Sequence, residues 1–209
     1  MEPLSPLRRH TGIAVPLLRN NIDTDAIIPS REMKRVSKHG LGEGLFAAWR
    51  YTLPGSREAD PAFILNDPAY RGASILLAGA NFGCGSSREH AVWALHEYGF
   101  RVIIAPSFGS IFYSNCVRNG ILPVELDEAA IARLAGAVAG DPAGRPLTVD
   151  LEAGQVLDPE GRALGFTINP GHRRMLMEGL DVIGLTLERA ADIDAFEQAD
   201  RQRRPWIYR

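Results

Sequence analysis

Residues 73–99 read ASILLAGANFGCGSSREHAVWALHEYG, in which an apolar run, a glycine-rich turn and an amphipathic segment follow one another directly. The run 73–80 is short and continuously apolar, which is typical of a strand buried on both faces of a sheet. After the turn, apolar side chains recur at the i, i+3, i+4 and i+7 spacing of a helix, and Gly99 supplies a stop signal. The helical positions are Ala91, Ala94, Leu95 and Tyr98. The stretch therefore predicts a strand, a tight turn and a helix.

The flanking segments extend this pattern in both directions. FRVIIAPS (100–107) and ILPVEL (121–126) are predicted strands, and GSIFYSNCVR (109–118) is a predicted helix between them. GIAVPLL (12–18) is a further strand upstream. Strands that alternate with helices in this way favour parallel pairing, so the fold class is α/β with a mostly parallel central sheet flanked by helices.

The second half of the chain predicts a smaller antiparallel part and a helical end. Glu128–Val138 is an alanine-rich helix, and three short strands follow it at 146–152, 155–158 and 162–168. Asn169 followed by Pro170 is a helix start signal, and Gly179 ends that short helix. We expect residues 1–209 to form a single domain with a helical C-terminal extension from about residue 181 to 209.

Composition excludes several classes of protein. A formal net charge of −2 and a pI of 6.2 provide no electrostatic footprint for nucleic acid or an anionic membrane. The N-terminus lacks the pattern of a signal peptide, so we expect a cytoplasmic protein. The chain has only two cysteines, Cys84 and Cys116, which by themselves cannot supply a zinc or iron–sulfur site. We therefore expect no metal centre held by this chain alone.

The glycine turn admits a structural and a functional interpretation. Ser86 and Glu89 form the S-x-x-E pattern of a capping box, in which each side chain satisfies a backbone amide of the other. Arg88, however, faces the positive end of a helix dipole, where a cation is mildly unfavourable unless an anion binds there. Backbone amides exposed at a helix N-terminus also form an anion site. The residues thus favour an anion site, and a capping Ser86 remains compatible with it.

Other motifs fail or remain weak. The turn lacks the lysine of a phosphate-binding P-loop, has Arg88 where a dinucleotide-binding turn has its third glycine, and lacks the G-x-S-x-G pattern of serine hydrolases. A thiol nucleophile at Cys84, paired with His90 or His96, is an open alternative. Asp23 and Asp25 form an Asx turn or weak magnesium ligands.

At this point the sequence resembles a known family. NFGCGSSREHAVWAL and VIIAPSFGSIFYSNCVRNGILPVEL resemble the small subunits of bacterial 3-isopropylmalate dehydratase, also called isopropylmalate isomerase, which are similar to the swivelling domain of aconitase. NNIDTDAIIPSREMKRVSKHGLGEGLFAAWRY and GLDVIGLTLERAADIDAFE fit the same family, so the resemblance covers nearly the whole chain. The implied fold is the swivelling β/β/α domain.

The resemblance implies half of a two-protein lyase. A large subunit would hold a four-iron four-sulfur cluster, and this chain would close over it without a cofactor of its own. The substrate would be a dicarboxylic acid of leucine biosynthesis, isomerised by loss and return of water. Ser86 would be the catalytic base, Ser87 and Arg88 would bind substrate oxygens, and Lys34 and Arg35 would bind a second carboxylate.

Two rival functions remain open on the sequence in addition to a thiol hydrolase that uses Cys84. The first is the small subunit of a related hydro-lyase that acts on citramalate, homoaconitate or dimethylmalate. The second belongs to another class: a stand-alone anion-binding module whose glycine turn holds phosphate.

Overall fold

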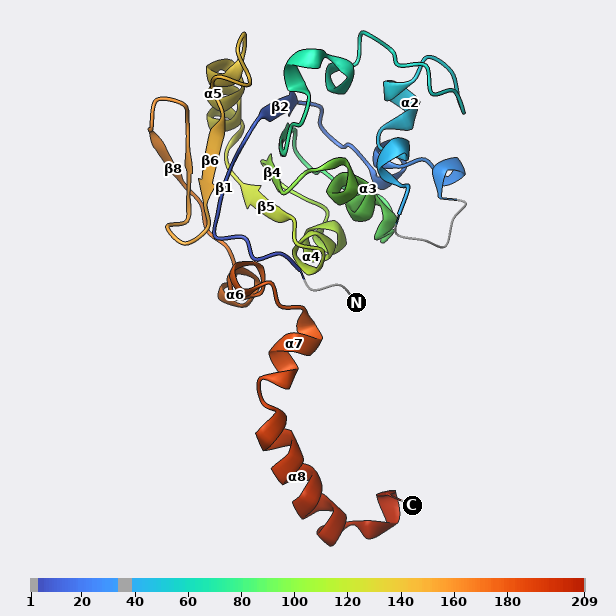
Figure 1. The fold of residues 1–209 in the computed structure, drawn as a ribbon, viewed down its shortest axis with the longest axis vertical. Helices are drawn as coiled ribbons and strands as arrows, with labels where there is room; N and C mark the ends of the chain where they lie inside the picture. The colour runs from blue at the N-terminus through green and yellow to red at the C-terminus, as the bar shows by residue number, and fades with distance from the viewer. Residues whose placement is uncertain (1–3, 34–38, 209) are drawn as a thin grey trace.

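The computed structural model describes residues 4–33 and 39–208 as two sheets with helices packed around them (Figure 1). The strands are β1 (Arg9–Gly12), β2 (Ala14–Leu17), β3 (Ile75–Ala78), β4 (Val102–Ala105), β5 (Leu122–Glu125), β6 (Leu147–Asp150), β7 (Gln155–Leu157) and β8 (Ala163–Gly165). The α-helices are α1 (Thr24–Ile27), α2 (Ala47–Arg50), α3 (His90–Tyr98), α4 (Ser110–Arg118), α5 (Glu128–Val138), α6 (Pro170–Glu178), α7 (Val182–Leu187) and α8 (Ala190–Arg203). Five short 3-10 helices complete the described residues: η1 (Ser30–Glu32), η2 (Gly42–Gly44), η3 (Ile64–Asn66), η4 (Pro68–Tyr70) and η5 (Pro205–Tyr208).

The predicted parallel sheet is confirmed. Its spatial order is β2-β3-β4-β5, and every neighbouring pair is parallel. All four residues of β3 are buried, as expected for a strand covered on both faces. Because parallel strands share one carboxyl edge, the segments that follow β2, β3 and β4 lie together at that edge.

Two hydrophobic cores cover the two faces of the parallel sheet. On one face, α3 and α4 pack over Leu76 and Ile103 together with the fully buried Phe82 and Phe100. On the other face, α5, α6 and the antiparallel sheet pack over Leu77. The helices α3 and α4 are therefore held rigidly against the strands from which the glycine turn emerges.

The antiparallel part is larger than expected. The sequence predicted one strand over 12–18, but the structure divides this region between the two sheets: β1 pairs antiparallel with β6, and β2 pairs parallel with β3. The four-stranded order is β1-β6-β7-β8. The three predicted short strands near residues 146–168 are confirmed as β6, β7 and β8. The polar alternation of Arg9–Gly12 is short, and nothing in it signals a partner at residue 147.

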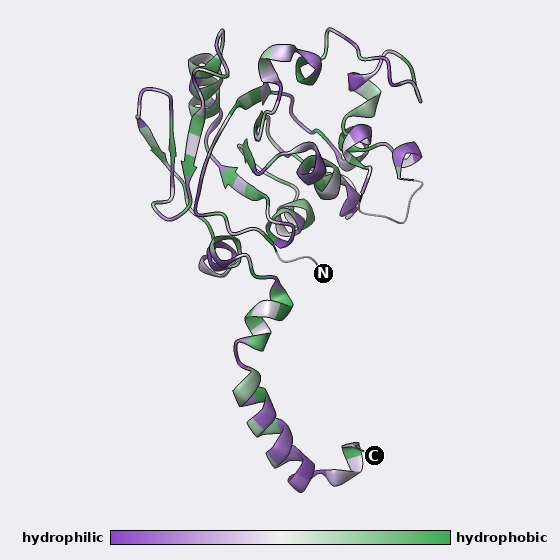
Figure 2. Cartoon of the chain, viewed as in Figure 1, coloured by the Kyte–Doolittle hydropathy of each residue, from purple (hydrophilic) through white to green (hydrophobic). Residues whose placement is uncertain are grey.

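The C-terminal residues form an arm that leaves the body of the molecule (Figure 1). The sequence predicted a helical extension over about 181–209, and the structure divides this region into two helices, α7 and α8, followed by η5. In Figure 2, which colours the ribbon by hydropathy, α7 and the start of α8 are mostly hydrophobic and the later part of α8 is hydrophilic. Phe196 and Trp206 are 64% and 66% exposed. An open apolar groove lies between the two helices, and its lining includes Val182, Leu185, Ile193 and Phe196. Among the described helices, none combines the length and apolar character that a bilayer crossing needs.

Candidate functional site

The glycine turn after β3 pairs with the segment that follows β2. The Gly83 N–H donates to the Ile22 carbonyl at 2.7 Å, and the Thr24 N–H donates to the Cys84 carbonyl at 3.0 Å. The Asn21 N–H also donates to the Ala80 carbonyl at 2.8 Å. Two sequence motifs separated by about 60 residues are thus joined by backbone hydrogen bonds into one structural unit at the edge of the parallel sheet.

Glycine is required in this turn by both conformation and space. Gly83 has a φ of 72°, and a Cβ there would lie 2.1 Å from the ring of Phe112. A Cβ on Gly109, in the loop after β4, would lie 2.7 Å from the Gly83 carbonyl oxygen. The loops after β3 and β4 therefore pack backbone against backbone, and this contact fixes the position of the glycine turn.

Ser86 is held by a buried threonine. Its hydroxyl lies 2.8 Å from the Thr24 hydroxyl, and its backbone N–H donates to the same Thr24 oxygen at 3.2 Å. Thr24 is 1% exposed, whereas Ser86 is half-buried and the neighbouring Ser87 is exposed. Ser86 therefore presents a hydroxyl with a fixed direction at a surface that a small ligand can reach.

The predicted capping box does not form. The helix α3 begins at His90, and Glu89 is its N-cap residue without a side-chain cap bond. The Glu89 carboxylate instead accepts a hydrogen bond from the Asn119 side-chain amide at 2.7 Å. The S-x-x-E pattern was therefore wrong as a structural explanation of Ser86 and Glu89, because their side chains hydrogen-bond to Thr24 and Asn119 instead.

The start of α3 presents backbone donors that the rest of the described chain does not use. Within residues 4–33 and 39–208, no group accepts a hydrogen bond from the backbone N–H of Ser87, Arg88, Glu89 or His90. Unpaired N–H groups at a helix N-terminus attract anions through both hydrogen bonding and the helix dipole. The turn therefore has the donor set of a carboxylate site next to the Ser86 hydroxyl.

Arg88 is oriented by an acidic partner. Its guanidinium forms an ion pair with Asp25, and both side chains are partly exposed. Asp23 caps α1 instead, by accepting the Ala26 N–H at 2.7 Å. Within the described residues no group of three His, Cys, Asp or Glu side chains could hold a metal ion, so the magnesium alternative at Asp23 and Asp25 gains no support.

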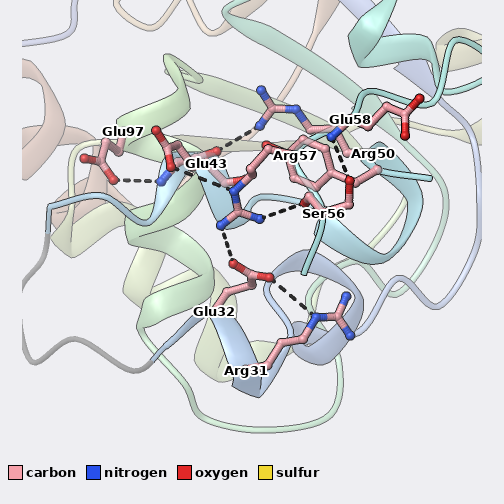
Figure 3. Close-up of polar contacts among 10 residues, drawn as sticks. Arg31, Glu32, Glu43, Arg50, Ser56, Arg57, Glu58 and Glu97 are labelled. Atoms are coloured by element: carbon pink, nitrogen blue, oxygen red, sulfur yellow. Dashed lines mark hydrogen bonds and ion pairs between the residues drawn. The ribbon is translucent and has the colours of Figure 1, made fainter. Parts of the chain in front are cut away.

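Lys34 and Arg35, the predicted second carboxylate site, lie outside the described residues. The chain on both sides of them is anchored (Figure 3). On one side the Glu32 carboxylate, whose side chain is 8% exposed, binds Arg57 at 2.7 Å. On the other side the Glu97 carboxylate accepts the Gly40 and Gly42 N–H groups at 2.6 and 2.7 Å.

The anchor at Glu32 is electrostatically favourable. The hydrogen bond from Arg57 outweighs burial and holds the pKa of Glu32 below its usual range, with a smaller contribution from Arg31. Glu32 packs closely on Gly44, where a Cβ would lie 2.8 Å from the Glu32 Cβ. The segment that ends at Met33 is therefore fixed to the loop 42–57 by one nearly buried carboxylate.

The thiol alternative is not supported by its expected partners. His90 packs on the ring of Trp93 at 4.8 Å, and His96 contacts the Arg101 guanidinium. Neither imidazole is paired with Cys84 in the described contacts. Cys116 is fully buried in the core, and burial raises the pKa of its thiol well above the ordinary value. Both observations disfavour thiolate chemistry.

The structure brings Ser86, Ser87 and Arg88 together and adds residues that the sequence did not single out for the site. Thr24 and Asn119 carry no catalytic signature, since a buried hydroxyl and a helix-ending amide are common structural groups. Asp25 was noted only as part of an acidic turn. The signal for Thr24 and Asp25 is the tight pattern Asp23-Thr24-Asp25, whose polar side chains precede a buried apolar segment.

Family models match most of the chain. Residues 4–129 match the aconitase C-terminal domain, and residues 183–209 match the C-terminal domain of the 3-isopropylmalate dehydratase small subunit. The first match contains the glycine turn, and the second contains nearly all of the C-terminal arm.

Close relatives cover the chain from end to end. The 3-isopropylmalate dehydratase small subunit of Cupriavidus necator is 62% identical, covering 98% of this chain and 99% of the relative. The protein of the same name from Methylibium petroleiphilum is 50% identical, with coverage of 98% and 97%. The solved structure of 3-isopropylmalate dehydratase from Methanocaldococcus jannaschii matches with a TM-score of 0.66 at 23% identity, covering 90% of this chain and 98% of that one. That likeness shows a shared fold.

Proposed function

This chain belongs to the family of 3-isopropylmalate dehydratase small subunits, and we propose that it supplies the proton-transferring and carboxylate-binding half of that hydro-lyase. The reaction assigned to it is the interconversion of 2-isopropylmalate and 3-isopropylmalate in leucine biosynthesis. The observation that carries the assignment of roles is the Ser86 hydroxyl, fixed by Thr24 beside the N–H groups at the start of α3, which have no acceptor among the described residues.

The iron–sulfur cluster of the proposed enzyme does not fit this chain. A four-iron four-sulfur cluster is held by cysteine thiolates, and one of the two cysteines here, Cys116, is fully buried with a raised thiol pKa. The described residues also offer no alternative cluster of metal ligands. In the proposal the large subunit therefore holds the cluster, whose Lewis acidity assists departure of the hydroxyl group.

Ser86 acts as the base in this proposal. Its alkoxide takes the proton from the carbon next to a carboxylate, the electrons of that C–H bond form the carbon–carbon double bond, and hydroxide leaves the neighbouring carbon. The same serine returns the proton when water adds in the other sense. The N–H groups at the start of α3 and the Arg88 guanidinium favour the negative charge that this cycle places on Ser86 and the substrate.

The remaining proposed residues bind substrate. Arg88 and the exposed Ser87 hold one carboxylate, and a guanidinium suits this role because it donates two parallel hydrogen bonds. Lys34 and Arg35 bind the second carboxylate. The ion pair between Arg88 and Asp25 supports this assignment, since it holds the guanidinium at the turn before a substrate arrives.

The test is the variant Ser86→Ala, assayed together with the large subunit. We expect kcat to fall by at least about 100-fold, because removing a general base costs roughly 10²–10⁴-fold, while association of the two subunits is unchanged. Ser114→Ala is the matched control, since among the described residues that hydroxyl bonds within its own helix, to the Ser110 carbonyl at 3.2 Å. Turnover of Ser86→Ala within a few fold of the native enzyme would remove Ser86 from the base role.

The rival functions predict different results in the same experiment. A related hydro-lyase would give a higher kcat/KM with citramalate, homoaconitate or dimethylmalate than with isopropylmalate. If the chain is an anion-binding module, calorimetry should detect phosphate binding to the isolated chain. That binding would not require Ser86 to accept a proton.

A further inference from the structure

We propose that Asn119 is a positioning residue, which draws the Glu89 carboxylate away from Ser86 and so prevents the local capping box. This inference rests on the proposed function of the Ser86–Arg88 turn. The juxtaposition that supports it is a single side-chain amide, at the C-terminal end of α4, bonded to the N-cap residue of α3.

The direction of the Asn119 amide is determined by its partners. Its oxygen accepts the Trp93 indole N–H at 3.0 Å, and an indole can only donate. Its nitrogen donates to the Asn115 carbonyl at 2.8 Å, and a carbonyl can only accept. The second proton of the amide nitrogen therefore points to the Glu89 carboxylate at 2.7 Å, and the amide cannot be reversed without losing all three bonds.

Without that bond, the local sequence favours a different start for α3. Ser86 and Glu89 have the spacing of a capping box, in which the Ser86 oxygen accepts the Glu89 N–H and the Glu89 carboxylate accepts the Ser86 N–H. Both capping-box bonds compete with the native hydrogen bonds between Ser86 and Thr24. The first redirects the Ser86 hydroxyl from Thr24, and the second removes the Ser86 N–H from the Thr24 oxygen.

A capping box would also change the charge at the site. It would place the Glu89 carboxylate beside the Ser86 N–H, where the proposed mechanism needs room for a substrate carboxylate and an alkoxide. A fixed anion there opposes both of them. By holding Glu89 on the α4 side, Asn119 leaves the Glu89 N–H available to a ligand and keeps the carboxylate away from the neighbouring N–H groups of Ser87 and Arg88.

The test is a double-mutant cycle in the enzyme reconstituted with its large subunit. Asn119→Ala releases Glu89, and we expect kcat to fall about tenfold, within the range that displacement of a catalytic group produces. Glu89→Ala removes the competing carboxylate but keeps the backbone N–H that belongs to the donor set. We therefore expect its kcat within about threefold of the native value, which is the factor that freedom among three Ser86 rotamers would cost. The double variant Asn119→Ala/Glu89→Ala is then as active as Glu89→Ala alone.

That recovery distinguishes positioning from simple structural support. If Asn119 only packs α4 against Trp93, removal of Glu89 adds a second defect, and the double variant is no better than Asn119→Ala. Asn119→Asp provides a second route, because it retains an acceptor for the indole N–H while repelling Glu89. A native kcat in both Asn119 variants, or no recovery when Glu89→Ala is added to either of them, would overturn the proposal.

Amide hydrogen exchange of the isolated chain gives a readout that needs no activity. The Glu89 N–H has no acceptor among the described residues, so it exchanges fast in the native chain. In Asn119→Ala the Ser86 oxygen accepts it, and we expect exchange at this amide to slow by at least about tenfold. Unchanged exchange would refute the capping-box switch even if Ser86→Ala has already confirmed Ser86 as the base.

Discussion

Replacing Thr24 with valine tests whether a buried hydroxyl sets the direction of Ser86. Valine has the same branched shape, so Thr24→Val leaves the packing at this 1% exposed position almost unchanged. It removes the acceptor of the Ser86 N–H and the partner of the Ser86 hydroxyl, at 3.2 and 2.8 Å. The perturbation is therefore confined to the two hydrogen bonds that fix one side chain.

The expected losses of stability and of turnover follow from the free energy of these two hydrogen bonds and from the freedom that Ser86 gains without them. Each is worth about 0.5–1.5 kcal/mol net, so loss of both should lower the free energy of unfolding by about 1–3 kcal/mol. For a chain of 209 residues, this corresponds to a loss of about 2–12 °C in the melting temperature. Released from Thr24, the Ser86 side chain can occupy three rotamers, which costs about threefold in kcat, and displacement of the oxygen can raise the loss towards about 100-fold.

Steady-state kinetics of the reconstituted enzyme measures the effect, and Thr24→Ser is the matched control. Serine keeps the hydroxyl but loses a buried methyl group, so its stability should fall by about 1 kcal/mol while kcat stays near the native value. In Thr24→Val, kcat and kcat/KM should fall together, because the bond positions a group that acts in the transition state.

The pair of variants makes the reasoning refutable. Both variants are expected to lose stability, so a loss of stability by itself cannot explain a fall in turnover that occurs in Thr24→Val alone. If Thr24→Val retains kcat within twofold of Thr24→Ser, the Thr24 hydroxyl does not position the base, and the contact serves only to close the turn.

Two further predictions concern stability. Gly83→Ala should lower the free energy of unfolding by at least about 2 kcal/mol, as measured by urea denaturation. The reason is that Gly83 has a φ of 72° and a Cβ there would lie 2.1 Å from the ring of Phe112. A change below about 0.5 kcal/mol would contradict the packing described. Burial, and then repulsion from Arg101, lowers the pKa of His10 and of His96 below the ordinary value of 6.5. The unfolded chain therefore binds more protons than the folded one, and stability should fall as the pH drops from 7 towards 5. Replacing both histidines with glutamine should flatten this pH dependence in thermal melts, and an unaltered slope would count against the prediction.

The parallel half of the fold could be predicted because its signals are local and long enough to read. The buried run at β3, the spacing in α3 and the stop at Gly99 each specify one element, and alternation of such elements specifies parallel pairing. The β1 pairing with β6 could not be predicted. Its strand is four residues long, and its partner lies about 140 residues away, so only the folded chain selects the register.

The sequence could name the candidate residues of the proposed site but not the residues that support them. Ser86, Ser87 and Arg88 are adjacent in sequence, so the turn and the helix dipole could be evaluated together. Thr24 is 62 residues from its partner Ser86, and Asn119 is 30 residues from its partner Glu89. Local sequence patterns do not reveal contacts at such separations. Lys34 and Arg35, outside the described residues, stay a prediction.

The start of α3 shows why local signals fail at this position and not elsewhere. A capping box would add about 1 kcal/mol to the helix, and the sequence contains both of its residues. The structure forgoes that gain by binding one residue to Thr24 and the other to Asn119. Structure alone would favour satisfied amides at a helix N-terminus, whereas recognition of an anion requires unsatisfied ones. A segment that gives up its own cap while tertiary contacts hold it in place therefore fits the proposed ligand better than folding alone. The N–H groups beside Ser86, which have no acceptor within the described residues, support an anion as that ligand.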